Sequence, residues 1–209
     1  MMKRVYFYTG FERLNHWIQA LLIFTLLLTG FDIHGTYGLF DYKTAFTVHN
    51  WCAWAWLTLF IFDVFYLIVT GEWRQYTPTA KKLIDVLLYY ALGIFRGEKH
   101  PVPKSERVKH NPLQRLTYLG IVSFLVPYQM ATGFLYYYYN DWPAIGLLGL
   151  PLGTMALLHT LGAFAFLTFV IVHVYMTTTG HSIFAHIKAM FTGWEEVEES
   201  TATGENSAA

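Results

Sequence analysis

Four long apolar stretches constrain this chain more than any other feature of its sequence. They cover residues 14–33, 49–70, 116–137 and 154–177. Each approaches or reaches the length of about 20 residues that a helix needs to cross the hydrocarbon core of a bilayer. Apolar residues make up 55% of the chain and charged residues only 13%, which is about half the charged share of a soluble domain. We therefore expect an all-α integral membrane protein, a four-transmembrane-helix bundle.

The basic residues are distributed very unevenly between the two sides of the membrane. Four crossings return the C-terminus to the side that holds the N-terminus, so that side carries residues 1–13, 71–115 and everything from 178. Thirteen of the fourteen Lys and Arg residues fall there, and Lys43 alone falls on the other side. By the positive-inside rule, both termini are expected in the cytoplasm. The protein is expected to be multi-pass in the bacterial cytoplasmic (inner) membrane.

Residues 1–194 are expected to form a single domain. Within the polar connection between the second and third spans, residues 79–96 are typical of an amphipathic helix lying on the cytoplasmic face. Pro127 lies inside the third span, where neighbouring helices can satisfy the freed carbonyl, so a kink is expected there. Residues 195–209 are acidic and then rich in Ser, Thr and Ala, and they are expected to be a disordered tail.

Charge and cysteine content exclude several classes of protein. The net charge is zero, so there is no basic footprint for nucleic acid. The one cysteine, Cys52, excludes an internal disulfide, a Cys-x-x-Cys-His haem attachment and an iron–sulfur cluster held by this chain alone. Cys52 lies in an apolar run and is expected to be a packing residue. The first apolar run follows basic residues as a secretory signal does, but no cleavage site follows it, so we expect a retained helix.

Four histidines lie at the ends of the expected spans. His16 is at the cytoplasmic end of the first span and His173 at the cytoplasmic end of the fourth. His49 is at the outer end of the second span and His159 near the outer end of the fourth. Depth therefore pairs His16 with His173, and His49 with His159. The fourteen residues between the two histidines of the fourth span give about 21 Å of rise and nearly four turns, so they share a face.

Each histidine pair suits one haem iron. Ionisable residues inside a bilayer are costly and usually face a functional interior. An iron held by one imidazole from the fourth span and one from another span has no open coordination site, which is typical of electron transfer. Zinc needs three or four ligands around one point, which histidines at two depths cannot supply. The small Gly162 and Ala163 are expected to let a flat macrocycle approach the fourth span. The other histidines are expected at the solvated surface: His34, His100, His110, His181 and His186.

Three charged residues lie near the inner histidine pair. Asp63 is the only acidic residue deep in a span. One interpretation is that it delivers protons or balances an arginine beside the haem, and the other is that it is a helix-end carboxylate paired with Arg74 or Arg115. Arg13 and Arg115 are candidate partners of haem propionates, because a guanidinium pairs with a carboxylate through two hydrogen bonds. A role in membrane topology alone is equally open for both arginines.

The chain resembles the cytochrome b subunits, also called gamma or membrane-anchor subunits, of membrane-bound formate dehydrogenases, nickel–iron hydrogenases and thiosulfate reductases. The resemblance covers about residues 10–194. The ordered set of four histidines with an Asn-x-x-Gln run is specific, whereas His-Trp alone is weak. The matching stretches are Arg13-Leu-Asn-His16-Trp17, Leu28-Thr-Gly30, Val48-His49, Asn111-Pro-Leu-Gln114, Leu158-His159, His173-Val-Tyr175 and Ile187-Lys188-Ala-Met190-Phe-Thr-Gly193.

The resemblance implies two haem b groups and a partner complex. In similar subunits the inner haem is held by the residues matching His16 and His173, and the outer haem by those matching His49 and His159. The implied partners are a periplasmic iron–sulfur electron-transfer subunit and its catalytic subunit. Whether the complex forms a higher oligomer stays open. Electrons would pass between that assembly and a quinone through the outer and then the inner haem.

The resemblance also implies a quinone site, for menaquinone or ubiquinone, on the cytoplasmic side. It would lie near the inner haem, beside the residues matching Asn111 and Gln114. Amides can hydrogen-bond a quinone carbonyl in either redox state. The alternative for Asn111 is a helix N-cap ahead of Pro112 at the first helical position.

Two other functions remain open from the sequence. One is a stand-alone dihaem quinone oxidoreductase of the bacterial b561 type, which handles superoxide or another small donor. The other is a haem-free membrane anchor or transporter. The aromatic residues Tyr136–Tyr139 and Trp142 on the outer side are expected to be an interfacial belt, with a docking surface as the alternative. The terminal substrate, the direction of electron flow and the quinone species stay open.

Overall fold

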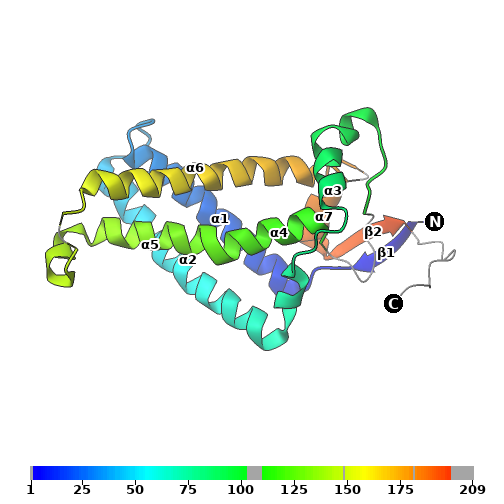
Figure 1. Ribbon diagram of the computed structural model, residues 1–209, viewed down its shortest axis with the longest axis horizontal. Helices are drawn as coiled ribbons and strands as arrows, with labels where there is room; N and C mark the ends of the chain where they lie inside the picture. Colours follow the sequence, from blue (N-terminus) through cyan, green and yellow to red (C-terminus); the bar gives the residue numbers. More distant parts are fainter. Residues whose placement is uncertain (1, 103–109, 148, 181, 199–209) are drawn as a thin grey trace.

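Four long helices form the body of the protein (Figure 1). The computed structural model describes residues 2–102, 110–147, 149–180 and 182–198. All four helices are long and apolar enough to cross a membrane, which confirms the expected all-α four-helix membrane bundle. The spans are α1 (Gly10–Ile33), α2 (Tyr42–Thr70), a third made of α4 (Pro112–Gly120), η3 (Ile121–Leu125) and α5 (Val126–Tyr137), and α6 (Leu152–Thr177).

The first two spans begin earlier than the apolar pattern predicts, because polar residues cap them. The Thr9 side chain accepts a hydrogen bond from the Glu12 amide while Glu12 accepts one from the Thr9 amide, a capping box that satisfies two amides at the start of α1. The Asp41 side chain accepts from the Thr44 amide at the start of α2. His49 therefore lies about two turns inside α2, rather than at its outer end.

The third span contains a π-helical turn directly before Pro127. The turn covers Ile121–Leu125, and α5 resumes at Val126. A proline has no amide hydrogen to give to the carbonyl four residues earlier, and its ring crowds that carbonyl. A wider π turn accommodates both effects, and π turns are a recognised cause of helix distortion. The π turn is a local departure from α-helical geometry just before Pro127, and the kink expected there stays a prediction.

The spans pack as two helical hairpins. α1 packs along α2, and α5 packs along α6, while α1 and α6 meet between the hairpins. Trp56, Val126 and Phe166 are buried where α2, α5 and α6 converge. The rings of Trp56 and Phe166 meet edge to face with centroids 5.4 Å apart. This aromatic contact joins the two hairpins near the middle of α2 and of α6.

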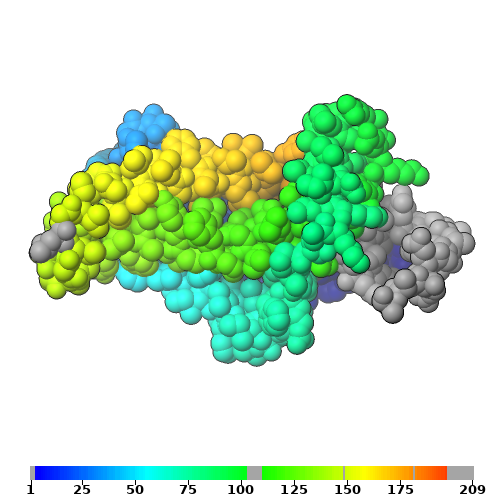
Figure 2. Space-filling view, viewed as in Figure 1, coloured from blue at the N-terminus to red at the C-terminus, as the bar shows by residue number. Residues whose placement is uncertain are grey.

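The short elements gather mainly at the end of the bundle where α1 begins and α6 ends (Figure 1). They are η1 (Glu72–Tyr76), α3 (Leu83–Ala91), η2 (Gly93–Arg96) and α7 (Ala185–Thr192), whereas η4 (Tyr139–Ile145) lies at the opposite end. Figure 2 shows the segment around α3 projecting from this end. The helix predicted over residues 79–96 is shorter, because Lys82 takes a left-handed backbone conformation (φ 57°) before α3 begins.

A two-stranded antiparallel sheet ties the two ends of the described chain together. β1 (Met2–Tyr6) pairs with β2 (Trp194–Glu198), with Tyr6 opposite Trp194. The Tyr6 and Trp194 rings meet edge to face at 5.2 Å. The expectation of a disordered tail from residue 195 is therefore wrong at its start, because backbone pairing with β1 orders residues 195–198. Residues 199–209 lie outside the described part of the chain.

Reporter fusions test the expected orientation of this bundle. Alkaline phosphatase fused after Lys188 is expected to be inactive, and the same enzyme fused after Asp141 is expected to be active, because the basic end of the bundle stays in the cytoplasm. Phosphatase activity in intact cells is the measurement, and a fluorescent-protein fusion at the same two positions gives the complementary signal. Phosphatase activity in the Lys188 fusion, with none in the Asp141 fusion, would show that the orientation is the opposite of the expected one.

Candidate metal centres in the bundle

The inner histidine pair joins the first and fourth spans. The ring centroids of His16 on α1 and His173 on α6 are 6.1 Å apart, with the rings inclined at 44°. Trp17 lies against His16, with centroids 5.1 Å apart, and Phe169 lies against His173 at 5.5 Å. Nδ1 of His16 is buried and has no hydrogen-bond partner among the described residues. The structure thus brings together the two residues that depth alone paired.

The outer pair joins the second and fourth spans in the same way. The ring centroids of His49 on α2 and His159 on α6 are 6.3 Å apart, with the rings inclined at 80°. Here both imidazoles have a hydroxyl partner. Thr29 Oγ1 lies 3.0 Å from His49 Nδ1, and Thr132 Oγ1 lies 3.2 Å from His159 Nδ1.

Both separations fit an iron between the two imidazoles. An imidazole nitrogen binds a metal at about 2 Å and the ring centroid lies about 1 Å behind it, so imidazoles on opposite sides of one iron have centroids about 6 Å apart. Within the described ranges no group of three or more His, Cys, Asp or Glu residues could hold a metal ion. Each centre therefore offers two protein ligands, as a haem needs, and the residues present fit that group.

A glutamine from α5 lies beside the outer pair. The Gln129 amide nitrogen is 3.3 Å from His159 Nε2, and Gln129 and Tyr128 occupy the space over Gly162. A Cβ at Gly162 would overlap Gln129 and come within 3.0 Å of Tyr128. Gly162 therefore allows the close crossing of α5 and α6, and the expectation that Gly162 and Ala163 let a macrocycle approach stays a prediction.

Asp63 lies in a chain of polar side chains that joins the middle of the bundle to its inner level. Gln19 donates to one carboxylate oxygen of Asp63 at 2.6 Å and accepts from the Trp56 indole at 3.3 Å. The other carboxylate oxygen of Asp63 is buried and has no hydrogen-bond partner in the described part of the chain. Neither Arg74 nor Arg115 is its hydrogen-bond partner there, so the interpretation as a helix-end ion pair is not supported.

The two candidate propionate partners bind backbone carbonyls. Arg13 donates from its guanidinium to the carbonyl of Phe191 in α7, and the neighbouring Trp17 indole donates to Met190 at 3.1 Å. Arg115 Nε donates to the carbonyl of His110 at 3.1 Å. These contacts give both arginines a structural role at the basic end of the bundle, and they leave further guanidinium N–H groups available.

Asn111 and Gln114 form a capping box at the start of the third span. Each side-chain oxygen accepts a hydrogen bond from the backbone amide of the other residue, at 2.9 and 3.0 Å, and Pro112 follows the cap. The structure thus realises the N-cap alternative for Asn111. The amide nitrogen of Asn111 remains for another partner, and it donates to the Tyr90 hydroxyl at 3.2 Å.

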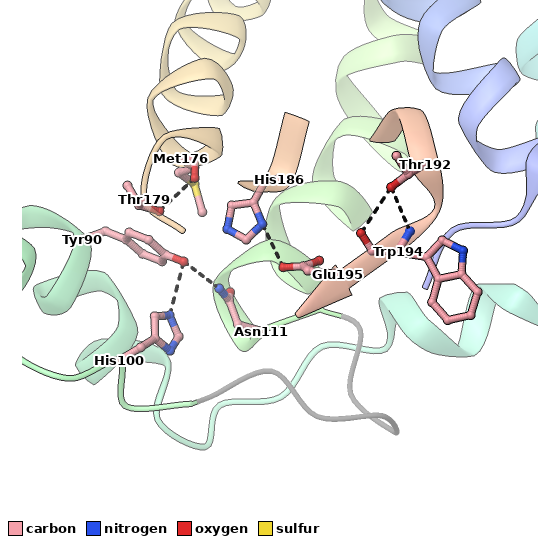
Figure 3. Close-up of polar contacts among 9 residues, drawn as sticks. All are labelled: Tyr90, His100, Asn111, Met176, Thr179, His186, Thr192, Trp194 and Glu195. Atoms are coloured by element: carbon pink, nitrogen blue, oxygen red, sulfur yellow. Dashed lines mark hydrogen bonds and ion pairs between the residues drawn. The ribbon is translucent and has the colours of Figure 1, made fainter. Parts of the chain in front are cut away.

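Tyr90 lies against Asn111, a contact that the sequence does not predict. Its hydroxyl lies between Asn111 and His100, with His100 Nε2 at 3.2 Å (Figure 3). Its backbone carbonyl accepts from the Tyr175 hydroxyl at 3.4 Å, two residues beyond His173. Burial raises the pKa of Tyr90 to about 12, so this hydroxyl keeps its proton at neutral pH. The sequence marks α3 as amphipathic, but that pattern does not show which tyrosine turns inward.

Three of the histidines expected at the solvated surface are partly buried instead. His100 meets Tyr90. His110 lies between the rings of Tyr76 and Tyr118, at centroid distances of 5.6 and 5.2 Å. His186 Nδ1 is 2.9 Å from a carboxylate oxygen of the buried Glu195 (Figure 3). Aromatic packing and the β1–β2 sheet cover these positions, while His34 is exposed as expected and His181 lies outside the described residues.

Comparisons with known proteins give one family and one curated relative. The model of a family described as prokaryotic cytochrome b561 matches residues 7–193. The chain is 31% identical to the cytochrome YdhU of Escherichia coli (strain K12) over 199 residues, which is 92% of this chain and 75% of that protein. No solved structure matches the chain.

Proposed function

The chain belongs to the prokaryotic cytochrome b561 family, and from that premise we propose that it is a dihaem subunit that exchanges electrons between a periplasmic partner and a quinone. The family makes it a membrane cytochrome b, a multi-pass electron-transfer protein of the bacterial inner membrane that binds haem b. The observation that carries the dihaem proposal is the pairing of four imidazoles at two levels, with centroids 6.1 and 6.3 Å apart.

His16 and His173 would hold the inner haem, and His49 and His159 the outer haem. When bound, each haem iron supplies a one-electron couple. An iron held by two imidazoles would have no coordination site for oxygen, which favours electron transfer over oxygen activation. Trp56 and Phe166, each seven residues beyond an outer histidine, pack in contact between the two levels and keep water out of the space between them.

Histidine variants test the two-level assignment. His159→Ala is expected to lose the outer haem and His173→Ala the inner haem, each leaving about half of the wild-type haem b per protein, since one axial ligand of one iron is removed. The measurement is the reduced-minus-oxidised α band together with extracted haem in purified protein. His34→Ala, at an exposed position after α1, serves as the control. Full pigment in either ligand variant would reject the pairing.

A quinone would bind at the cytoplasmic end, where Asn111, Gln114 and Tyr90 lie close to the end of α6 that carries His173. Reduction of a quinone to a quinol takes two electrons and two protons, and both protons would enter from the cytoplasm. The Tyr90 hydroxyl and the Asn111 amide are neutral donors suited to a quinone carbonyl. Arg13 and Arg115 would use their remaining N–H groups for haem propionates.

Two replacements of Asn111 distinguish a role in quinone binding from its role as a helix cap. Asn111→Ser keeps a good cap oxygen but loses the amide N–H, so quinone turnover should fall roughly three- to tenfold, the effect of one hydrogen bond, at unchanged stability and haem content. Asn111→Ala loses the cap as well and should also lower stability by about 1 kcal/mol. If a stable Asn111→Ser variant kept the wild-type rate of quinone turnover, Asn111 would act only as a helix cap.

Asp63 would lead protons toward the quinone. Its carboxylate is partly buried, one oxygen has no hydrogen-bond partner among the described residues, and Gln19 holds the other. A buried carboxylate with a free oxygen can take up and release a proton, unlike an amide.

Asp63→Asn keeps the shape of the side chain and removes this proton carrier. Quinol formation is expected to fall roughly tenfold, within the range for lost proton transfer, while the haem spectrum stays unchanged. Turnover is measured between about pH 6 and pH 8, where cytoplasmic proton supply matters most. Asp85→Asn, at an exposed position in α3, is the matched control. Equal rates in Asp63→Asn and wild type across that range would end the proton-path proposal.

The partner would be a periplasmic iron–sulfur subunit with its catalytic subunit. As in the complexes that the sequence resembles, the reaction that supplies or takes the electrons would take place on the catalytic subunit. Trp142 is buried, and its indole donates to the carbonyl of Leu135, whereas Tyr136–Tyr139 stay exposed at the outer end. Purification of a lone, active subunit would favour the stand-alone alternative.

A further inference from the structure

We infer that Thr29 and Thr132 are positioning residues of the outer haem site. Each accepts a hydrogen bond from Nδ1–H of one histidine ligand, turns Nε2 of that imidazole toward the iron, and lowers the midpoint potential of the outer site. The inference rests on the proposed function, which assigns a haem to His49 and His159.

Both threonine hydroxyls already donate their one proton to a backbone carbonyl. Thr29 Oγ1 donates to the carbonyl of Thr25 at 2.7 Å, and Thr132 Oγ1 donates to the carbonyl of Tyr128 at 2.9 Å. A hydroxyl has one proton to donate and two lone pairs, so toward the histidine each threonine oxygen accepts. The histidine nitrogen 3.0 or 3.2 Å away must therefore carry the hydrogen. This fixes the Nδ1–H tautomer and leaves the lone pair on Nε2, the arrangement that a metal ligand needs.

Gln129 also lies beside the His159 ring. Its amide nitrogen is 3.2 Å from His159 Nδ1 and 3.3 Å from Nε2. An amide N–H can only donate, and Nδ1–H is itself a donor to Thr132. Because it lies almost equally far from both ring nitrogens, this amide does not by itself decide which nitrogen carries the hydrogen.

A glycine next to each threonine makes the approach to the ring possible. A Cβ at Gly30 would lie 3.2 Å from His49 Cε1, and a Cβ at Gly133 would lie 3.0 Å from His159 Cε1. Both are closer than ordinary van der Waals contacts between carbon atoms. Each histidine thus lies in a corner made by a Thr-Gly pair of the preceding span.

The two corners are built from a repeated sequence. The tripeptide Thr-Gly-Phe occurs at residues 29–31 and again at 132–134. Phe31 packs on Phe164 at 5.2 Å, and Phe134 packs on Trp54 at 4.8 Å. Phe164 and Trp54 each lie five residues beyond an outer histidine, so each Phe closes on the helix that carries the other ligand. Two unrelated helical hairpins would not be expected to share four such contacts.

The hydrogen bonds differ between the two levels. Donation from Nδ1–H makes an imidazole a more basic ligand, and a more basic ligand favours ferric over ferrous iron. His49 and His159 both donate in this way, whereas His16 Nδ1 has no partner among the described residues. This difference lowers the potential of the outer site relative to the inner site and so favours electron flow from the periplasmic side inward.

Potentiometric titration of Thr29→Val and Thr132→Val tests the inference. Valine keeps the shape of threonine and removes the acceptor. The outer haem is expected to shift to a more positive midpoint potential by up to about 59 mV, which corresponds to a tenfold change in the ferric-to-ferrous preference for one electron. The g values of the ferric outer haem in electron paramagnetic resonance should also move, because the imidazole planes are no longer fixed. The inner haem should keep its potential, and Thr29→Ser should restore the outer one.

Matched controls come from α1, which carries Thr29, and from α6, which carries His159. Thr25 on α1 and Thr168 on α6 donate to carbonyls four residues earlier, at 2.8 and 2.9 Å, and touch no histidine. Thr25→Val and Thr168→Val are expected to leave both potentials unchanged. If Thr29→Val loses the outer haem and Thr29→Ser keeps it, the inference is supported. If both variants lose the outer haem, the inference is overturned.

Failure of the inference and failure of the proposed function look different. Suppose that both valine variants keep the wild-type potential and g values of the outer haem, while His49→Ala and His159→Ala still lose that haem. This result would overturn the role of the threonines and leave the dihaem assignment standing. Retention of both haems in His49→Ala would overturn the assignment itself.

Discussion

Both centres require two imidazoles from different helices to stay about 6 Å apart, and α6 is the helix that the two centres share. α6 must therefore face α1 at one level and α2 at the other. That condition fixes the crossing of the two hairpins, and Trp56 against Phe166 maintains it midway between the levels. A small rotation of α6 would separate both histidine pairs at once, so both pairs depend on the packing that holds this crossing.

The rigid geometry of helices explains which parts could be predicted. A rise of 1.5 Å per residue and a span length near 20 residues set the depth of each histidine, so the pairs His16–His173 and His49–His159 follow from the sequence alone. The contacts of Thr29 and Tyr90 could not be predicted, because they depend on how each helix is rotated about its axis. The β1–β2 pairing joins residues about 190 positions apart, and no local pattern indicates it. The start of α2 could have been found from its cap at Asp41.

The outer level is close to two-fold symmetric, and the inner level is not. The residue fourteen positions beyond His159 is His173, whereas the residue fourteen positions beyond His49 is Asp63. The second ligand of the inner pair comes instead from His16 on α1. A carboxylate thus occupies the place in one hairpin that an imidazole occupies in the other. The inner level thus has a group that can exchange protons as well as groups that can bind iron, which suits the side where a two-electron, two-proton reaction is proposed.

The β1–β2 sheet and the inner pair have the same consequence for biosynthesis. Each joins the beginning of the chain to its end: β1 to β2, and His16 on the first span to His173 on the last. Neither contact can form while the ribosome is still making the middle of the protein. The first hairpin, α1 with α2, can insert, pack and form the Gln19–Asp63 hydrogen bond early, but His16 must wait for His173 on α6. Closure of the bundle is therefore the last event of synthesis, and a chain truncated before α6 lacks both centres.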